Sequence, residues 1–149
     1  MHSLKRFLAL GGGEKRAVIV VLVVAPLVKL SLRLRGYART IGLVSRFRRS
    51  PVAGFDEATE LARLSYASMR RLPFHLTCLE GSVVIWWLLG GDRSAGEIRF
   101  GVTTDGDKDQ PSFHAWVEHG GHTIDDGTEH LDRYLPFTGQ SEPQPESFD

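Results

Sequence analysis

The sequence has little of what defines several common classes of protein: of its 149 residues one is cysteine, and 18 Lys+Arg balance 18 Asp+Glu. A single cysteine excludes an intramolecular disulfide framework and a zinc module built from several cysteines, so we expect a reducing, cytoplasmic location. No apolar run reaches the roughly twenty residues of a membrane-spanning helix. Residues 17–28 form a shorter apolar stretch that contains Pro26, and Lys29 follows it instead of a signal-peptide cleavage site.

The balanced net charge hides a division along the chain. Residues 1–50 contain eleven Lys and Arg residues and one acid, a formal charge of +10, and the remaining residues carry −10. This division indicates either a solvated helical face or contact of the front third with an acidic partner, anionic lipid or the acidic remainder of the chain. The basic part has few aromatic residues that could stack on bases, so nucleic-acid binding is not expected.

Helical patterns dominate the first third of the chain. Residues 17–28 predict a buried or partner-facing helix, with peripheral membrane contact as the less favoured alternative. Gly11–Gly13 predict a flexible joint before this segment. Pro26 fits the first turn of a helix that Gly36 ends.

A second helical pattern follows a predicted linker at residues 49–54. Its apolar residues recur at helical spacing, and they are Ala58, Leu61, Ala62, Leu64 and Met69. We expect Asp56 to cap this helix and the helix to stop before Pro73.

The second half of the chain changes to the period of β-strands. Residues 98–102 alternate between apolar and other side chains, and so do residues 113–117. Gly120-Gly121 predict a tight turn, so residues 113–126 are expected to form a hairpin. Residues 137–149 have little core material and predict a flexible, acidic tail.

The only cysteine stands at the start of a third predicted helix. Thr77 and Glu80 have the spacing of a capping box, and Gly90-Gly91 end the helix. Residues 83–89 are apolar on every side, so this helix should be buried against other elements. Cys78 then lies in the first turn, where unpaired N–H groups and the helix dipole favour a nucleophilic thiolate. The alternative interpretation of a lone cysteine is a small buried hydrophobic residue.

A histidine on a later strand has the chemistry of the base that such a thiol requires. His114 is either a satisfied core residue or the partner of Cys78 in a thiol protease or acyltransferase. Asp125 and Asp126 are the candidates for the carboxylate that orients the imidazole. A two-residue turn at Gly120-Gly121 puts Asp125 on the face of His114, and a three-residue turn puts Asp126 opposite it. The sequence leaves this choice open.

These motifs resemble those of the lasso-peptide B proteins, and more narrowly the stand-alone protease form with a transglutaminase-like fold. Three segments carry the resemblance: residues 73–82 with Cys-Leu-x-x-Ser, the strand of residues 98–102, and His-Ala-Trp-Val-Glu at residues 114–118. The resemblance covers residues 55–127 clearly and the basic front part loosely. One departure is Gly81, where relatives commonly have a basic residue.

The resemblance implies a catalytic triad. Cys78 corresponds to the nucleophile and His114 to the base. Asp126, twelve residues after the histidine, corresponds to the orienting carboxylate, with Asp125 as the fallback.

The resemblance also implies an architecture and an activity. The expected fold is α+β, with the nucleophile-bearing helix packed on a small antiparallel sheet in a catalytic core of residues 53–136, preceded by a basic helical region of residues 1–52. The expected activity is cleavage of the leader from a lasso precursor. A transglutaminase-like or arylamine-type acyltransferase with the same triad is the alternative.

The partners implied are the precursor peptide, a small leader-recognition protein encoded separately and the lasso cyclase, with the front helices docking the leader or its recognition protein. No cofactor is implied. His119, His122 and His130 lie near a predicted turn and are interpreted as solvated residues, so a metal site is not expected.

Overall fold

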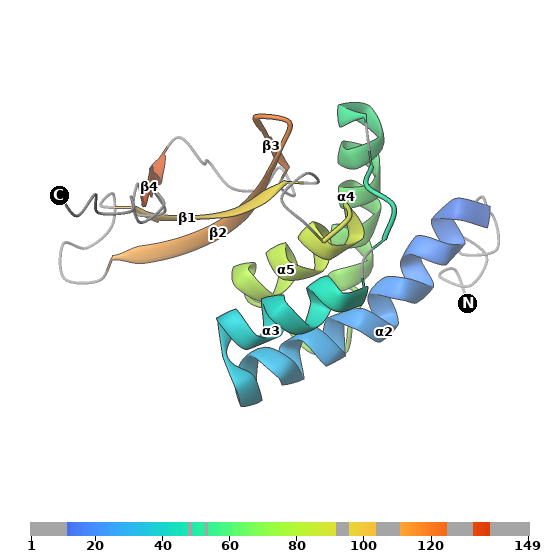
Figure 1. The fold of residues 1–149 in the computed structure, drawn as a ribbon, viewed down its shortest axis with the longest axis horizontal. Coiled ribbons are helices and arrows are strands. Elements are labelled where there is room, and N and C mark those ends of the chain that lie inside the picture. Colours follow the sequence, from blue (N-terminus) through green and yellow to red (C-terminus); the bar gives the residue numbers. More distant parts are fainter. Residues whose placement is uncertain are drawn as a thin grey trace, which may run out of the picture.

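The computed structural model describes residues 12–47, 49–52, 54–91, 96–103, 111–124 and 133–137, which form an α+β fold (Figure 1). The elements in chain order are α2 (Gly12–Arg35), α3 (Tyr37–Val44), a 3-10 helix (Ser45–Phe47), α4 (Phe55–Met69), α5 (Cys78–Leu88), β1 (Glu97–Thr103), β2 (Ser112–His119), β3 (His122–Ile124) and β4 (Leu135–Pro136). The described helices all precede the described strands, as in many α+β folds. The predicted fold class is confirmed.

The strands form one antiparallel sheet in the order β3-β2-β1-β4. In the pairing of β1 with β2, Ile98 lies opposite Val117 and Phe100 lies opposite Ala115. Alternate residues of a strand share a face, so these four side chains lie on one face of the sheet. Ile98, Ala115 and Val117 are buried, which identifies this as the core face.

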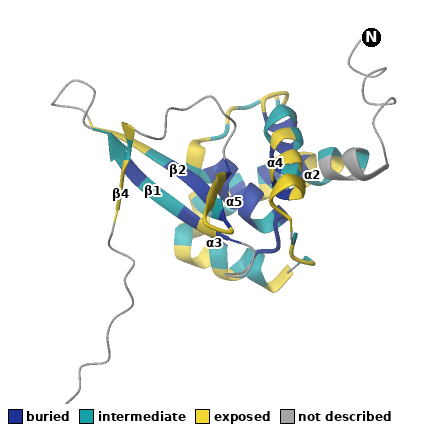
Figure 2. Cartoon of the chain, turned by 90° about the horizontal axis from the view of Figure 1, so that it is seen from above, coloured by how far each residue is buried: buried dark blue, intermediate teal, exposed yellow. Residues whose placement is uncertain are grey.

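Helix α5 is the central element of the fold. It contacts β1 and β2 on the side of the sheet, and it contacts α2 and α4 on its other sides (Figure 1). Buried residues gather where the helix meets the sheet (Figure 2). Within residues 83–89 every residue except Trp87 is buried. This confirms the prediction from the apolar sequence, because a helix without a polar side needs neighbours all round.

The predicted turns around this helix and in the hairpin are confirmed. Thr77 is the N-cap of α5. Gly90 and Gly91 follow its last turn with φ angles of 141° and 71°. Gly120 and Gly121 have φ angles of 58° and 79°, and they form a two-residue turn between β2 and β3. Positive φ is the conformation in which glycine is favoured over other residues.

Helix α2 is longer than predicted. It begins at Gly12 and continues through Pro26, so the predicted joint at Gly12 and Gly13 and the predicted helix start at Pro26 are wrong, and Gly11 lies outside the described residues. An interior proline costs a helix about 3 kcal/mol. Burial of the apolar residues on both sides of Pro26 against α4 and α5 offsets this cost. These residues are Val21, Ala25 and Val28.

The start of α4 also differs from the prediction. The N-cap residue is Gly54, and Asp56 lies inside the first turn without a capping hydrogen bond, so the assignment of Asp56 as cap is wrong. The carboxylate is exposed and still lies near the positive end of the helix dipole. Aspartate is favourable both at the cap and in the first turn, so composition alone misplaced the boundary. The predicted stop before Pro73 is confirmed, because α4 ends at Met69.

Within the described residues, no helix is both long and apolar enough to cross a membrane. Phe137 is the one described residue of the predicted tail, residues 137–149. The division into a front region, a catalytic core and a tail remains a prediction. In the structure, α2 contributes Val21 and Val28 to the same hydrophobic core as α5 and the sheet.

Candidate active site

The candidate nucleophile lies at the first position of α5. Thr77 precedes it in an extended conformation and caps the helix, so Cys78 begins the first helical turn. Its side chain is exposed, although most of the helix behind it is buried. The residue is therefore accessible from solvent, and the interpretation of Cys78 as a buried hydrophobic residue is wrong.

The capping box leaves backbone donors beside the thiol. The Thr77 N–H donates to Oε2 of Glu80 at 2.8 Å, and the Glu80 N–H donates to Oγ1 of Thr77 at 3.3 Å. A helix has four N–H groups at its start without an intrahelical partner, and the box satisfies two of them. The N–H groups of Cys78 and Leu79 remain, and they have no hydrogen-bond partner among the described residues. Donors in this position suit an oxyanion formed when the sulfur attacks a carbonyl.

The start of α5 is held in place by the first helix. Nζ of Lys29 on α2 lies 3.0 Å from Oε2 of Glu80 and donates to the His75 carbonyl at 2.8 Å. The Glu80 side chain is nearly buried and accepts from both Lys29 and the Thr77 N–H. A buried carboxylate needs such partners to offset its desolvation. The contacts fix Glu80, and hence the capping box, against α2.

A buried serine joins α5 to the strand that carries His114. The Phe100 carbonyl accepts from the Phe137 N–H at 2.9 Å, so it points away from β2. Phe100 and Ala115 are opposite one another, and such a pair in an antiparallel ladder points its carbonyls in opposite directions. The Ala115 carbonyl therefore points to the other edge of β2, where it accepts from Oγ of Ser82 at 2.9 Å.

Among the described residues, β3 pairs with β2 only from Val117 to His119. The Ala115 carbonyl on this edge of β2 accepts its hydrogen bond from the Ser82 side chain. Ser82 lies one helical turn after Cys78 and is fully buried. Ala115 directly follows His114. The hydrogen bond between Ser82 and Ala115 therefore joins α5 to β2 at a point one helical turn from Cys78 and one residue from His114.

Replacing Ser82 by alanine is expected to lower the free energy of unfolding by about 1–3 kcal/mol, because the buried Ala115 carbonyl would lose its partner. Urea denaturation of the purified variant measures this loss. Ser68→Ala is the matched control: Ser68 is also buried, but it donates to Leu64 of its own helix, whose carbonyl remains available for helical bonding. We expect the control to cost less than about 1 kcal/mol. Equal losses in the two variants would contradict the anchoring role of Ser82.

His114 lies on the face of β2 opposite to Ala115. It is half-buried. Its ring is stacked near Trp116, with centroids 6.2 Å apart and an interplanar angle of 16°, and it lies 5.1 Å from the ring of Tyr134. These two aromatic side chains set the orientation of the imidazole in the structure. The described contacts of the ring do not include one with Sγ of Cys78.

The same face of the sheet carries an ion pair beside His114 and Trp116. Nε of Arg99 donates to Oε2 of Glu118 at 2.9 Å, and Arg99 lies opposite Trp116 in the sheet. Trp116 is thus enclosed between His114, Glu118 and the neighbouring strand, and it is buried. This arrangement gives a structural role to the Trp and Glu of the His-Ala-Trp-Val-Glu motif.

Gly101 is the residue over which the Trp116 ring packs. Gly101 lies opposite His114 on β1, and a Cβ atom there would lie 2.9 Å from two atoms of the Trp116 ring and 3.1 Å from the Leu135 carbonyl oxygen. Gly101→Ala is therefore expected to displace Trp116 and to lower the free energy of unfolding by about 1–3 kcal/mol. Urea denaturation measures the loss, and tryptophan fluorescence of the folded state reports the displacement.

Gly42→Ala is the control for this substitution. A Cβ atom at Gly42 meets nothing within 4 Å, and the residue lies inside α3. We expect this variant to be more stable by about 0.5–1 kcal/mol, because alanine favours a helix. A Gly101→Ala protein as stable as the wild type, with unchanged fluorescence, would contradict the packing described here.

The two candidate carboxylates, Asp125 and Asp126, lie outside the described residues. The register of β2 and β3 pairs Val117 with Ile124 and His119 with His122. This is the register of the two-residue turn, whose continuation pairs Trp116 with Asp125. The resemblance favours Asp126, so the identity of the third residue remains a prediction.

Two residues near the site have roles that sequence reasoning missed. The sequence analysis identifies Ser82 only as the serine of the Cys-Leu-x-x-Ser motif. A serine among apolar helix residues is nevertheless a sign of a buried hydrogen bond. Tyr134 contacts the His114 ring from the last described segment of the chain, and no spacing or periodicity indicates this contact. Gly81 is buried, and a Cβ atom there would meet Tyr66 and Met69 of α4, so the residue packs against that helix.

In the part of the chain that the structure describes, no group of three His, Cys, Asp or Glu side chains is placed to hold a metal ion. His119 is buried and His122 is exposed, and His130 lies outside the described residues. The prediction that these histidines are solvated is therefore wrong for His119, which is buried.

Comparison with known proteins agrees with this architecture. Residues 21–138 match the family model described as the transglutaminase-like superfamily, and this match extends from within α2 to β4. No curated protein and no solved structure matches significantly. The match spans the cysteine-bearing helix and the histidine-bearing strand together.

Proposed function

The chain belongs to the transglutaminase-like superfamily, and on that premise we propose that it is a cysteine peptidase that removes the leader from a lasso-peptide precursor. Enzymes of this superfamily typically depend on a cysteine. The finer proposal rests on the combination of Cys-Leu-x-x-Ser at residues 78–82 with His-Ala-Trp-Val-Glu at residues 114–118, which resembles the stand-alone lasso B proteins.

The observation that carries the proposal is the hydrogen bond from Ser82 to the Ala115 carbonyl. It ties the helix that begins with Cys78 to the strand that carries His114, and this supports a thiol and a base on neighbouring elements of one site. The exposure of Cys78 supports a macromolecular substrate, because a peptide needs access to the sulfur from outside. Catalytic hydrogen bonds often tighten only when substrate is bound, and the mechanism requires the His114 imidazole to come within hydrogen-bond reach of Sγ of Cys78 in the substrate complex.

The proposed mechanism is amide hydrolysis in two steps. The imidazole of His114 takes the proton of Cys78, and the thiolate attacks the carbonyl at the junction of leader and core. The N–H groups of Cys78 and Leu79 donate to the oxyanion that forms. His114 then gives its proton to the departing amine, and water cleaves the thioester. Asp126 holds the imidazole in the required tautomer throughout.

We propose the precursor peptide as substrate and a small, separately encoded leader-recognition protein as the partner that presents it. A macrolactam-forming cyclase uses the freed core peptide. The proposed location is the cytoplasm, because the mechanism needs a reduced thiol at Cys78.

The test is mass spectrometry of a candidate precursor incubated with the protein and the leader-recognition partner. The expected products are the free leader and the free core peptide, with a mass gain of one water in total. A precursor that stays intact with a folded, reduced enzyme would contradict the proposal. Omission of the partner is the control, and it should slow cleavage without changing the cleaved bond.

The alternative is an acyltransferase with the same triad. The exposed position of Cys78 leaves the acyl-enzyme open to an amine as well as to water. Adding a primary amine to the reaction separates the two functions. A hydrolase gives the same carboxylic acid product with and without the amine, whereas an acyltransferase gives the amide.

A further inference from the structure

Helix α2 is apolar around most of its circumference, but the core covers only one side of it. Val21, Ala25 and Val28 are buried against α4 and α5. The opposite side exposes six large aliphatic residues, which we call the aliphatic face: Ile19 (53% exposed), Leu22 (47%), Val23 (56%), Leu27 (60%), Leu30 (54%) and Leu34 (73%). Most surface helices carry polar residues on this side.

The aliphatic face is one continuous stripe. Its residues follow one another at intervals of one, three or four positions, so they lie on the same side of the helix. From Ile19 to Leu34 the stripe extends for about 22 Å at the rise of an α-helix. Contiguous apolar patches of this kind mark surfaces that bind another molecule.

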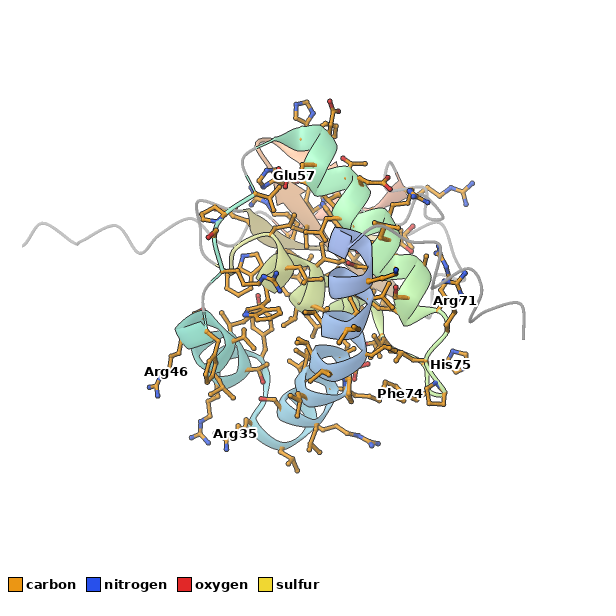
Figure 3. The ribbon with its side chains drawn as sticks, turned by 90° about the vertical axis from the view of Figure 1, so that its right-hand side faces the viewer. Arg35, Arg46, Glu57, Arg71, Phe74 and His75 are labelled. Atoms are coloured by element: carbon orange, nitrogen blue, oxygen red, sulfur yellow. The ribbon has the colours of Figure 1, made fainter. Side chains whose placement is uncertain are left out.

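Basic side chains flank the aliphatic face. Viewed from the side on which α2 lies in front, Arg35 and Arg46 lie beyond one flank and Arg71 lies on the other (Figure 3). Arg33 and Arg39 are also exposed on α2 and α3. No Asp or Glu occurs in residues 15–47. An occupant of this surface therefore needs an apolar part for the stripe and negative charges for its margins.

We infer that the aliphatic face of α2 and its arginine margins bind an anionic membrane surface. Lipid acyl chains accept a ridge of Ile, Leu and Val side chains without requiring shape complementarity, and lipid phosphates suit flanking arginines, whose guanidinium groups bind phosphate oxygens in pairs. Arginine also extends its apolar stem along the boundary while its charge stays at the headgroups. Because one side of α2 packs along its length against α4 and α5, only its exposed side can meet the bilayer, so α2 lies along the surface.

Two other occupants fit the observations less well. A second copy of the chain would bring two sets of the same arginines together, and like charges across an interface are unfavourable. A protein partner usually makes about one hydrogen bond per 100–200 Å² and inserts aromatic anchors. The aliphatic face offers no side-chain hydrogen-bonding group and no aromatic residue, since it consists of Ile, Leu and Val alone.

Membrane binding by α2 is distinct from the proposed peptidase activity, and either can fail without the other. The two are connected by structure, because Lys29 of the same helix binds Glu80 in the capping box of α5. A membrane-bound α2 therefore fixes the position of the α5 start relative to the bilayer.

Sedimentation of the full chain with vesicles tests this inference. We expect binding to vesicles of phosphatidylcholine and phosphatidylglycerol and much weaker binding to phosphatidylcholine alone. The double variant Leu27→Gln/Leu30→Gln should lower the binding constant by about tenfold or more, because two exposed aliphatic side chains no longer enter the acyl region. The double variant Arg35→Glu/Arg46→Glu should lower it by a similar factor, and binding should depend less on salt.

Leu135→Gln is the matched control, because Leu135 is 63% exposed on β4, at the sheet end of the molecule away from α2. It should bind vesicles like the wild type. Wild-type protein that stays in the supernatant with anionic vesicles would overturn the inference, and a leucine variant that binds as tightly as the wild type would do the same. A wild-type dimer that becomes monomeric in the leucine variant, without vesicle binding, would assign the face to a second copy instead.

Discussion

Cys78→Ala is expected to abolish cleavage of the precursor, with a loss of about 10⁴-fold or more in kcat/KM. The reason is that the sulfur forms the covalent bond to the acyl group, and residues that act as one catalytic unit lose nearly everything when the nucleophile is removed. Cys78 is exposed, so its truncation should change the free energy of unfolding by less than about 0.5 kcal/mol. Cleavage rates measured by mass spectrometry, with melting curves of both proteins, check the two expectations together.

The single cysteine allows an independent control for this prediction. Thiol-selective alkylation of the wild type has Cys78 as its single target, and it should reproduce the loss seen in the alanine variant. His114→Gln should cause a loss of comparable size, and the double variant should be little worse than either single variant, because the two residues act in the same step. Cleavage that survives Cys78→Ala would assign the activity elsewhere and leave the triad residues as part of a binding module.

Local signals in the sequence were sufficient for the elements around the candidate site. The capping box of Thr77 and Glu80 and the turn at Gly120-Gly121 each depend on contacts between residues close in the chain. Such contacts follow from residue type and spacing alone. The apolar interior of α5 predicted its burial for a similar reason, because no side of it suits solvent.

Helix α2 shows where local signals were misleading. Pro26 and the glycines before it commonly interrupt or begin a helix, so they predict a joint and a helix start. The structure has a continuous helix through Pro26 because Val21, Ala25 and Val28 pack against elements that follow much later in the chain. The stabilisation from this tertiary burial exceeds the cost of about 3 kcal/mol for an interior proline. The local sequence pattern gives no information about these distant contacts.

The candidate site was predictable in its residue types but not in its connections. Cys78 and His114 were identified from chemistry and from the resemblance. The bond between Ser82 and Ala115 and the contact between His114 and Tyr134 join residues far apart in sequence. Their formation depends on strand register, which becomes known only once the sheet is assembled. The aliphatic face of α2 is similar, since exposure depends on which side the core covers.

Gly96→Ala is expected to be the most destabilising single substitution proposed here, with a loss of about 3–5 kcal/mol in the free energy of unfolding. Gly96 precedes β1 with a φ angle of +141°, which strains an alanine, and a Cβ atom there would overlap the Glu118 carbonyl oxygen of the paired strand. Backbone of β2 cannot move aside without breaking the ladder with β1. The Gly96 carbonyl also accepts from Nε1 of Trp86 at 2.9 Å, so a shift of the residue would disturb the core side of α5.

Gly36→Ala separates the cost of the positive φ angle from the cost of the clash with the Glu118 carbonyl. Gly36 has a φ angle of +75° and a Cβ atom there meets nothing within 4 Å, so only the backbone strain of about 1–2 kcal/mol remains. Urea denaturation of both variants should therefore show a loss at Gly96 that exceeds the loss at Gly36 by about 2 kcal/mol or more. Equal losses would mean that strand β2 yields at Glu118, and the close approach of β1 to β2 would then not constrain the sheet that positions His114.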